Sequence, residues 1–378
     1  MIYKCKNCDG NMIYHVEERK LYCPYCNSMD TEKVIDGHNV GVCDSCGGEL
    51  YVGQYDSVVK CSYCSQYVID KTRVEGEYEP SRILPFKVGK EQAKTMIRMH
   101  YRDKKYVPKS FLSKANLEKM EGVYVPFWLY DFNVNVNFHG TGFRERVVAD
   151  EETANQTMSC YDVYREFDAA FRKIPADASV AMPDKIMDML EPYDYGELEH
   201  FNPKYLSGFL AEIYSDEAKE FESRVNQKVA KDIEKVLANH LRNFKMITTI
   251  DKKITAEHKG AEYVLLPVWK YLYTYQGKEY VYYINGQSGK VIGKAPFSVG
   301  KMIASLGAVF LLVLLAAWLI LSLLLGEGVF IYAPIVAAVV TAIYMLATWP
   351  KQGKITTTEK TFLASQRVHD IRDILKST

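Results

Sequence analysis

Four Cys-x-x-Cys pairs, a stretch of alternating polar and apolar residues and two long apolar runs together predict an α+β protein. The expected architecture is two tandem small β zinc ribbons, a middle domain of mixed antiparallel sheet and helices, and a C-terminal two-helix transmembrane hairpin. The chain has 378 residues, enough for two or three domains. Basic and acidic residues number 47 each, so the overall charge indicates neither an acidic nor a basic partner.

Eight of the nine cysteines form four Cys-x-x-Cys pairs that belong to two repeats. Fourteen residues separate the two pairs within each repeat, and each cysteine recurs 38 residues later. This is the spacing of a zinc ribbon, in which two short knuckles supply four thiolates to one metal ion. The predicted ligands are Cys5, Cys8, Cys23 and Cys26 in residues 1–37, and Cys43, Cys46, Cys61 and Cys64 in residues 38–75.

Each fourteen-residue span is expected to form a β-hairpin. The predicted strands are Met12–Val16 with Lys20–Tyr22 in the first repeat and Glu49–Val52 with Ser57–Lys60 in the second. Four thiolates leave no open coordination position, so two structural Zn²⁺ ions are expected rather than catalytic ones. Disulfides would need an oxidising compartment, and iron in place of zinc stays an open alternative.

The charge of the cysteine repeats bears on their partner. Residues 1–75 contain eight basic and eleven acidic residues, a balance of −3. Two metal ions with four thiolates each would bring the region to about −7. A surface that follows a phosphate backbone should be basic. The balance therefore favours protein–protein contact over nucleic acid, with a purely structural role as a further alternative.

The middle domain, residues 76–298, shows both helical and strand periodicity. Apolar residues alternate with polar ones along two segments, which predicts strands with one buried face. A long apolar stripe before Phe244 predicts a helix that docks on this sheet or pairs with a partner helix. The predicted elements are a helix at Lys90–Asp103, strands at Val123–Phe138 and Tyr161–Arg172, the long helix ending at Phe244, and a meander of Glu262–Tyr275, Glu279–Ile284 and Lys290–Ile292.

This domain contains a second internal sequence repeat. Val125–Tyr130 and Leu266–Tyr271 share the pattern Pro-x-Trp-x-Tyr, and each is expected to open a strand. Pro126 and Pro267 would then stand at strand starts, where a missing N–H donor does little harm. No phosphate-binding loop or hydrolase motif is present, and we expect Cys160 to be a small core residue rather than a nucleophile. No enzymatic activity is expected.

Two uncharged apolar runs stand near the C-terminus. Met302–Leu325 and Val329–Trp349 contain 24 and 21 residues, and only Gly326-Glu327-Gly328 separates them. Each is long enough to cross a bilayer, so residues 299–350 are expected to form the membrane hairpin. Lysines flank the hairpin on both sides and are absent from its turn. By the positive-inside rule, the protein is expected in the cell membrane as a multi-pass protein with both termini cytoplasmic.

The tail, residues 351–378, carries six basic and three acidic residues. Beside a membrane this composition favours anionic lipid headgroups. A short strand or helix that adds to the middle domain is the alternative.

These features together resemble a bacterial protein family. The tandem ribbons, the Gly122–Tyr130 and Ile284–Gly293 stretches and the late hairpin are similar to the TFIIB-type zinc-ribbon membrane proteins of Gram-positive bacteria, the YdjG-like group. Members are often labelled as the replication-restart helicase PriA, but the likeness to that helicase covers the paired cysteines alone. The resemblance implies a membrane anchor that works with SPFH-domain and phage-shock-protein-A-like proteins in envelope stress. It carries over the eight cysteines and no catalytic residue.

The sequence thus predicts a non-enzymatic, membrane-anchored zinc-ribbon scaffold or adaptor that recruits cytoplasmic partner proteins. The alternative is a DNA-associated zinc-ribbon factor of the replication-restart (PriA-like) type, which the ribbons alone support. The partners and the oligomeric state are not determined by the sequence.

Overall fold

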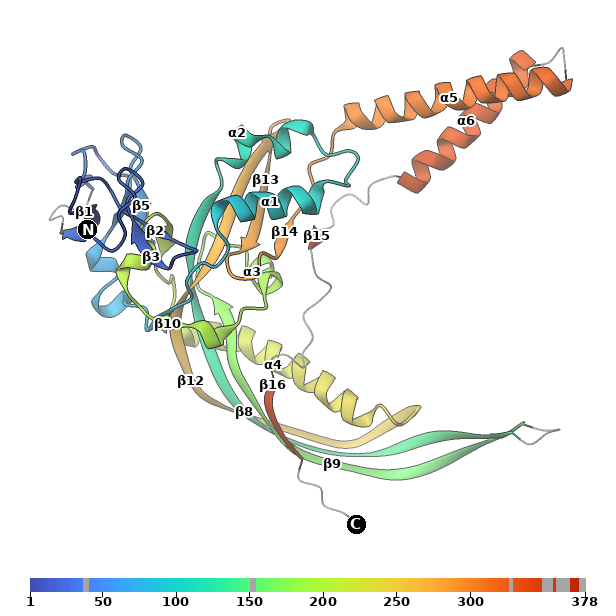
Figure 1. Ribbon diagram of the computed structural model, residues 1–378. Coiled ribbons are helices and arrows are strands. Elements are labelled where there is room, and N and C mark those ends of the chain that lie inside the picture. Colours follow the sequence, from blue (N-terminus) through green and yellow to red (C-terminus); the bar gives the residue numbers. More distant parts are fainter. Residues whose placement is uncertain (37–40, 150–153, 326–328, 349–355, 358–367, 374–378) are drawn as a thin grey trace.

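The computed structural model describes residues 1–36, 41–149, 154–325, 329–348, 356–357 and 368–373. Figure 1 shows a cysteine-rich end, a central body, a long curved arm and two helices that project from the body. The protein is α+β, with one large mixed sheet at its centre. This confirms the predicted class.

The two cysteine repeats, which we name the first cysteine unit (residues 1–37) and the second cysteine unit (residues 38–75), differ in their strands. In the first unit β2 pairs with β3 as expected, and β1 pairs with β4. In the second unit the prediction of a strand at Glu49–Val52 is wrong: Glu49 forms an isolated bridge with Val42, and β5 pairs with β6 instead. Glycines flank the failed segment on both sides, which weakens a strand. The bounds are β1 (Ile2–Cys5), β2 (Ile13–His15), β3 (Lys20–Tyr22), β4 (Glu32–Ile35), β5 (Asp56–Lys60) and β6 (Tyr67–Ile69).

The large sheet runs from the C-terminal part of the chain into the second cysteine unit. Its order is β15-β14-β13-β12-β8-β11-β5-β6, and β7, β9, β10 and β16 branch from this path. The predicted meander is present as β12, β13 and β14. The bounds are β7 (Arg82–Ile83), β8 (Glu121–Ala149), β9 (Ala154–Asp177), β10 (Glu199–His200), β11 (Leu210–Glu212), β12 (Met246–Tyr275), β13 (Lys278–Asn285), β14 (Val291–Gly293), β15 (Thr356–Thr357) and β16 (Val368–Asp373).

The arm is built from three unusually long strands, β8, β9 and β12, with α4 (Ala218–Leu241) lying along it (Figure 1). At about 3.3 Å per residue, the 29 residues of β8 span roughly 95 Å. Alternate side chains of β8 and β9 are buried against the apolar stripe of α4. This confirms the predicted alternation, and the stripe docks on the sheet rather than serving a partner helix. The buried residues include Phe132, Val134, Val136, Phe138, Val163, Phe167, Ala169 and Phe171 of the strands and Val225, Val229, Ile233, Val236 and Leu237 of α4.

The two Pro-x-Trp-x-Tyr segments lie side by side in antiparallel strands. Pro126 of β8 pairs with Leu265, and Pro267 of β12 pairs with Tyr124. The expectation that both prolines open strands is wrong, because β8 and β12 begin well before them. Each proline carbonyl accepts a hydrogen bond at 2.9 Å from a backbone N–H outside these two strands, that of Ala178 or Gly286.

Helices cover the body of the sheet beside the arm. Helix α1 (Lys90–Tyr101) buries one face against aromatic residues of β12 and β13, so its predicted position is confirmed. The remaining short helices connect the strands. They are α2 (Lys114–Leu117), α3 (Asp184–Leu190) and 3₁₀ turns at Lys71–Arg73, Gly76–Tyr78, Lys109–Leu112, Tyr195–Glu197 and Pro203–Leu206.

Two apolar helices project from the body, α5 (Val299–Leu325) and α6 (Val329–Thr348). Within α5, Val299–Ser322 is long and apolar enough to cross a bilayer, and few of its residues are buried by the rest of the protein. In α6 the corresponding stretch, Tyr332–Thr348, is apolar but shorter. The two helices touch, and Ser305 Oγ lies 3.3 Å from the Tyr344 hydroxyl. The predicted turn at residues 326–328 and Trp349 lie outside the described residues.

Two pieces of the C-terminal tail add strands to the sheet. β15 pairs with β14, and β16 pairs with β9 near the middle of the arm. Of the two alternatives for the tail, the described residues fit the added strand. Lipid binding by the tail stays a prediction.

Candidate metal centres

The eight predicted ligands gather into two separate clusters. Cys5, Cys8, Cys23 and Cys26 form the first and Cys43, Cys46, Cys61 and Cys64 the second, and all ligand atoms of a cluster lie within 4.8 Å of one another. The Sγ–Sγ distances are 3.6 Å for Cys5–Cys26, 3.4 Å for Cys8–Cys23, 3.6 Å for Cys43–Cys64 and 3.7 Å for Cys46–Cys61. In every Cys-x-x-Cys pair the first cysteine is buried and the second is exposed.

All four Cys-x-x-Cys turns have the same backbone geometry. The N–H of the first cysteine donates to the carbonyl five residues later, and its own carbonyl accepts from the N–H four residues later, at 2.8–2.9 Å. The residue after the second cysteine has a left-handed backbone, with φ between 59° and 72°. Left-handed φ favours Gly, Asn and Asp. The positions hold Asp9, Asn27, Gly47 and Ser65, a signal for the knuckle that the cysteine spacing alone did not use.

Hydroxyl groups beside the first cluster lower the pKa of two of its thiols. A hydrogen bond with the Thr31 side chain, at 3.5 Å, lowers the pKa of Cys5 to about 6. Ser28 Oγ lies 3.2 Å from Cys26 Sγ and lowers the pKa of that thiol as well. In the second cluster, burial raises the pKa of Cys43 to about 12. Thr31 and Ser28 are contacts that the sequence reasoning missed.

The two clusters fit a tetrahedral metal ion. Four sulfurs bound to Zn²⁺ at about 2.3 Å lie about 3.8 Å apart, close to the distances found here. Thiolates are preferred ligands of Zn²⁺ and of iron in such sites. Each cluster could therefore hold one metal ion. Such an ion would supply structural cross-linking, since its four positions are filled by the protein.

The sequence duplication extends to a glycine–tyrosine contact at each metal site. A Cβ on Gly10 would lie 2.5 Å from the Tyr25 ring, and a Cβ on Gly48 would lie 2.5 Å from the Tyr63 ring. Each tyrosine stands between the two cysteines of a knuckle, and each remains 73% exposed. Each glycine thus lets a tyrosine ring lie close to the backbone, and a side chain there would push the ring away.

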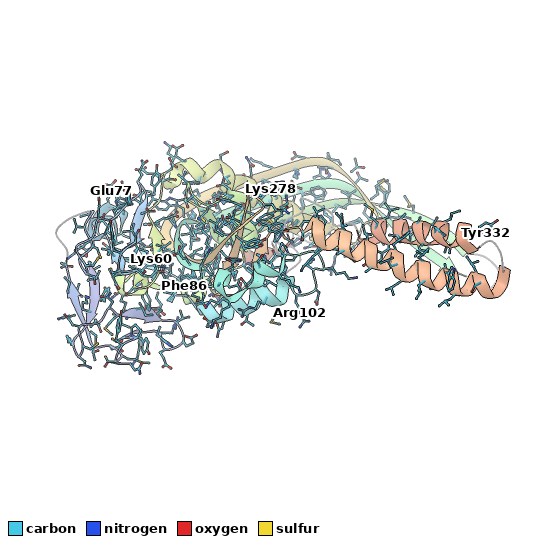
Figure 2. The ribbon with its side chains drawn as sticks, turned by 90° about the horizontal axis from the view of Figure 1, so that it is seen from above. Lys60, Glu77, Phe86, Arg102, Lys278 and Tyr332 are labelled. Carbon is cyan, nitrogen blue, oxygen red and sulfur yellow. The ribbon has the colours of Figure 1, made fainter. Side chains whose placement is uncertain are left out.

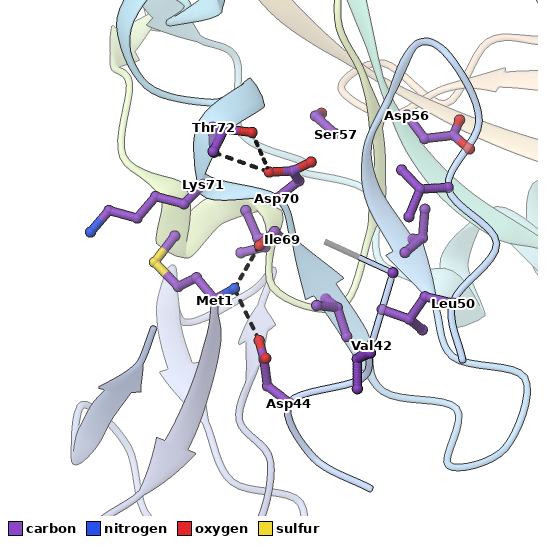
Figure 3. A pocket seen from close by; sticks show the side chains of 14 residues that line it. Met1, Val42, Asp44, Leu50, Asp56, Ser57, Ile69, Asp70, Lys71 and Thr72 are labelled. Atoms are coloured by element: carbon purple, nitrogen blue, oxygen red, sulfur yellow. Dashed lines mark hydrogen bonds and ion pairs between the residues drawn. The ribbon is translucent and has the colours of Figure 1, made fainter. Parts of the chain in front are cut away.

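A cavity of about 90 Å³ lies in the second cysteine unit, and Met1 of the first unit forms part of its lining (Figure 3). The backbone nitrogen of Met1 lies 2.7 Å from the carbonyl of Ile69 and 3.2 Å from the carboxylate of Asp44, as the dashed lines show. Val42 and Leu50 supply part of the apolar lining. The first residue of the first cysteine unit is thus hydrogen-bonded directly to the second unit.

Both units are also attached to the body. In the first unit the N–H of Tyr14 donates to the carbonyl of Ser207 at 2.8 Å, and Ser207 Oγ donates to the carbonyl of Met12 at 2.7 Å. In the second unit β5 pairs with β11, which pairs with β8. Hydrogen bonds therefore cross the predicted boundary at residues 75 and 76, although the boundary itself stays a prediction.

The ninth cysteine belongs to neither cluster. Cys160 lies on β9 opposite Phe143 and is exposed. The expectation of a core position is wrong, because Val163 and Phe167 occupy the face that α4 covers and Cys160 has the opposite parity along the strand.

Comparisons with known proteins place the chain in a family. No family model matches it, and no solved structure matches it. It is 30% identical over 337 residues to a protein of Bacillus subtilis (strain 168) described as uncharacterized protein YdjG. The similarity covers 86% of this chain and 98% of that relative. The chain therefore belongs to the same protein family as YdjG.

Proposed function

We propose that this chain is a non-enzymatic, membrane-anchored zinc-ribbon scaffold that recruits cytoplasmic proteins to the cell membrane. The observation that carries the proposal is the presence, on one chain, of two four-cysteine clusters and a helix long and apolar enough to cross a bilayer. A metal ion with four protein ligands has no position left for a substrate. Zinc in these sites would hold the cysteine units in shape rather than perform catalysis.

In this proposal α5 and α6 cross the membrane as a hairpin, with both termini in the cytoplasm. The lysines that flank the helices support this orientation. The helices pack through Ala317 and Ala333, with Leu314 and Leu321 beside them. Small residues at such contacts let membrane helices approach closely.

Insertion of α5 would require a wider angle between the helices and the arm. In Figures 1 and 2 the arm and the helix pair leave the body on the same side. Described side chains near the end of the arm include charged residues such as Arg144 and Glu145, which do not enter a bilayer. The angle between the helix pair and the arm would therefore open on insertion, which keeps the arm in water.

Partner binding has candidate anchors on the cysteine units. Tyr25 and Tyr63 are largely exposed, and their rings lie close to the backbone of Gly10 and Gly48. Tyrosine offers a large contact area with only two side-chain torsions to fix on binding, and it is enriched among residues that dominate interface energies. We place the recruiting surface at these two tyrosines.

The resemblance to TFIIB-type zinc-ribbon membrane proteins suggests which partners to look for first. SPFH-domain proteins and phage-shock-type proteins of the envelope-stress response are the first candidates in this proposal. The acidic balance of residues 1–75 favours a protein partner over DNA.

Affinity capture of the full chain from solubilised membranes tests the proposal. The double variant Tyr25→Ser/Tyr63→Ser should lose most of the captured partner and keep two metal ions per chain. Tyr51→Ser is the matched control, since Tyr51 is 89% exposed and is not held on a glycine.

Capture of no specific partner by the wild-type chain would contradict the scaffold role. Salt-sensitive binding of fork or single-stranded DNA by the wild-type chain would favour the replication-restart alternative instead. Recovery of the chain in the soluble fraction after cell lysis would contradict the anchor.

A further inference from the structure

A strongly basic segment lies at the base of the two apolar helices. We name residues Arg98–Lys109 the basic loop; it comprises the end of α1 and the connection to the following 3₁₀ turn. It contains five basic residues and one acidic residue. Of the lysines and arginines in this loop, Arg102 is the one with an ion pair among the described residues, to Asp103, and those two side chains are 76% and 83% exposed. The basic loop therefore carries an excess of unpaired positive charge.

Contacts place the basic loop against the ends of both helices. The carbonyl of Tyr106 accepts a hydrogen bond from the N–H of Ser298 at 2.8 Å, immediately before α5. The Tyr106 hydroxyl donates to Thr348 Oγ1 at 3.2 Å, at the last residue of α6. Lys301 Nζ donates to the carbonyl of Val107 at 2.6 Å. The basic loop thus bridges the start of one helix and the end of the other.

The basic loop is held by its apolar residues and exposes its lysines. Tyr106, Val107 and Pro108 are buried, whereas Lys104 and Lys105 are exposed, and so is Lys109. Lys105 Nζ also lies 5.7 Å from the ring centre of Tyr344 in α6. Figure 2 shows Arg102 at the outer edge of the body, on the side from which the helices leave. The positive groups are therefore fixed near the level at which the apolar helices begin.

We propose that the basic loop binds the anionic headgroups of the bilayer that α5 enters. This inference rests on the proposed membrane insertion and adds a second, peripheral contact to it. A lysine near an anionic surface contributes about fivefold to binding, so three lysines contribute roughly a hundredfold.

The test uses the full chain in a zwitterionic detergent, titrated with short-chain phosphatidylglycerol or phosphatidylcholine and followed by native mass spectrometry. The wild-type chain should bind phosphatidylglycerol saturably, and added salt should weaken that binding. Replacing Lys104, Lys105 and Lys109 by Gln should weaken it roughly a hundredfold. Replacing the same three residues by Arg should preserve it.

A matched control neutralises three exposed lysines of α4 and the arm, Lys219, Lys231 and Lys253, and should bind like the wild type. Metal content serves as the check that the triple Gln variant is folded. If that variant does not retain two metal ions per chain, the single Gln variants are titrated instead, and each should bind phosphatidylglycerol about fivefold more weakly.

Three results would overturn the inference: wild-type affinity in the Gln variants, equal binding of phosphatidylcholine, or competition by inorganic phosphate at the same concentration as the lipid. Carbonate extraction of membranes tests the anchor separately. If the chain resists extraction but does not bind the lipid as expected, only this inference is contradicted. If carbonate extracts the chain, the proposed membrane anchor is contradicted.

Discussion

Glu262 lies at the junction of three strands near the base of the arm, and its replacement by Gln should destabilise the protein measurably. The carboxylate accepts two hydrogen bonds from Arg82 at 2.5 Å, one from Lys173 at 2.5 Å and one from Ser81 at 3.1 Å. These bonds, chiefly that of Arg82, lower the pKa of Glu262 from 4.5 to about 2. The network joins β7, β9 and β12, so it holds the arm to the body.

The expected loss follows from the pKa. A change from 4.5 to about 2 corresponds to about 3 kcal/mol, and the 23% exposure of the side chain reduces our expectation to about 2 kcal/mol. The apparent Tm of the full chain in detergent should fall by about 4–8 °C. Circular dichroism at pH 7 measures this change.

The pH dependence gives a further check on Glu262. Its pKa is lower in the folded protein, so its stabilisation is complete above pH 4.5 and is lost as the pH falls towards 2. The difference in apparent Tm between the wild type and Glu262→Gln should therefore become smaller as the pH is lowered. Glu257→Gln is the control on the same strand. Glu257 is 65% exposed, and within the described ranges its ion pair is with Lys259, so its replacement should lower the free energy of unfolding by less than about 1 kcal/mol. Equal changes in the two variants would refute the reasoning.

Three other predictions address the metal sites, a buried carboxyl and the arm. The double variant Cys8→Ser/Cys26→Ser should lower the metal content from two ions per chain to one, whereas the control Cys160→Ser should keep two. Elemental mass spectrometry measures the metal content. Two ions in the double variant would contradict the four-thiolate site. Burial raises the pKa of Asp177 to about 6. Its protonated form therefore favours folding, and the stability of the protein should fall as the pH rises from about 4 to 6. The apparent Tm of Asp177→Asn should depend less on pH across that range than the Tm of the wild type. Ile233→Ala in α4 should lower the free energy of unfolding by about 2–5 kcal/mol, because the side chain is 1% exposed. Amide hydrogen exchange should become faster in the paired strands of the arm. Unchanged exchange would show that α4 does not support the arm.

The parts of the fold that the sequence predicted correctly are those with local causes. A Cys-x-x-Cys knuckle closes through hydrogen bonds between residues four and five apart, so the spacing was enough to assign all eight cysteines to two clusters. The alternation around Val134 identified the buried face of β8 for a similar reason, since side chains of a strand point to opposite faces in turn. Expectations about non-local features were less reliable: Cys160 is exposed, and Pro126 lies inside a strand.

By itself, the sequence determined which cysteines form the two clusters, the apolar helix α5 and the stripe of α4, because each depends on a spacing within one segment. The tertiary structure decided that β11 joins the second cysteine unit to β8 and that the basic loop lies against the ends of α5 and α6. Those contacts link residues far apart in the chain; Tyr106 and Thr348 are 242 positions apart. They depend on how all the strands pair and pack, and no local pattern of residue types records which distant segments will meet.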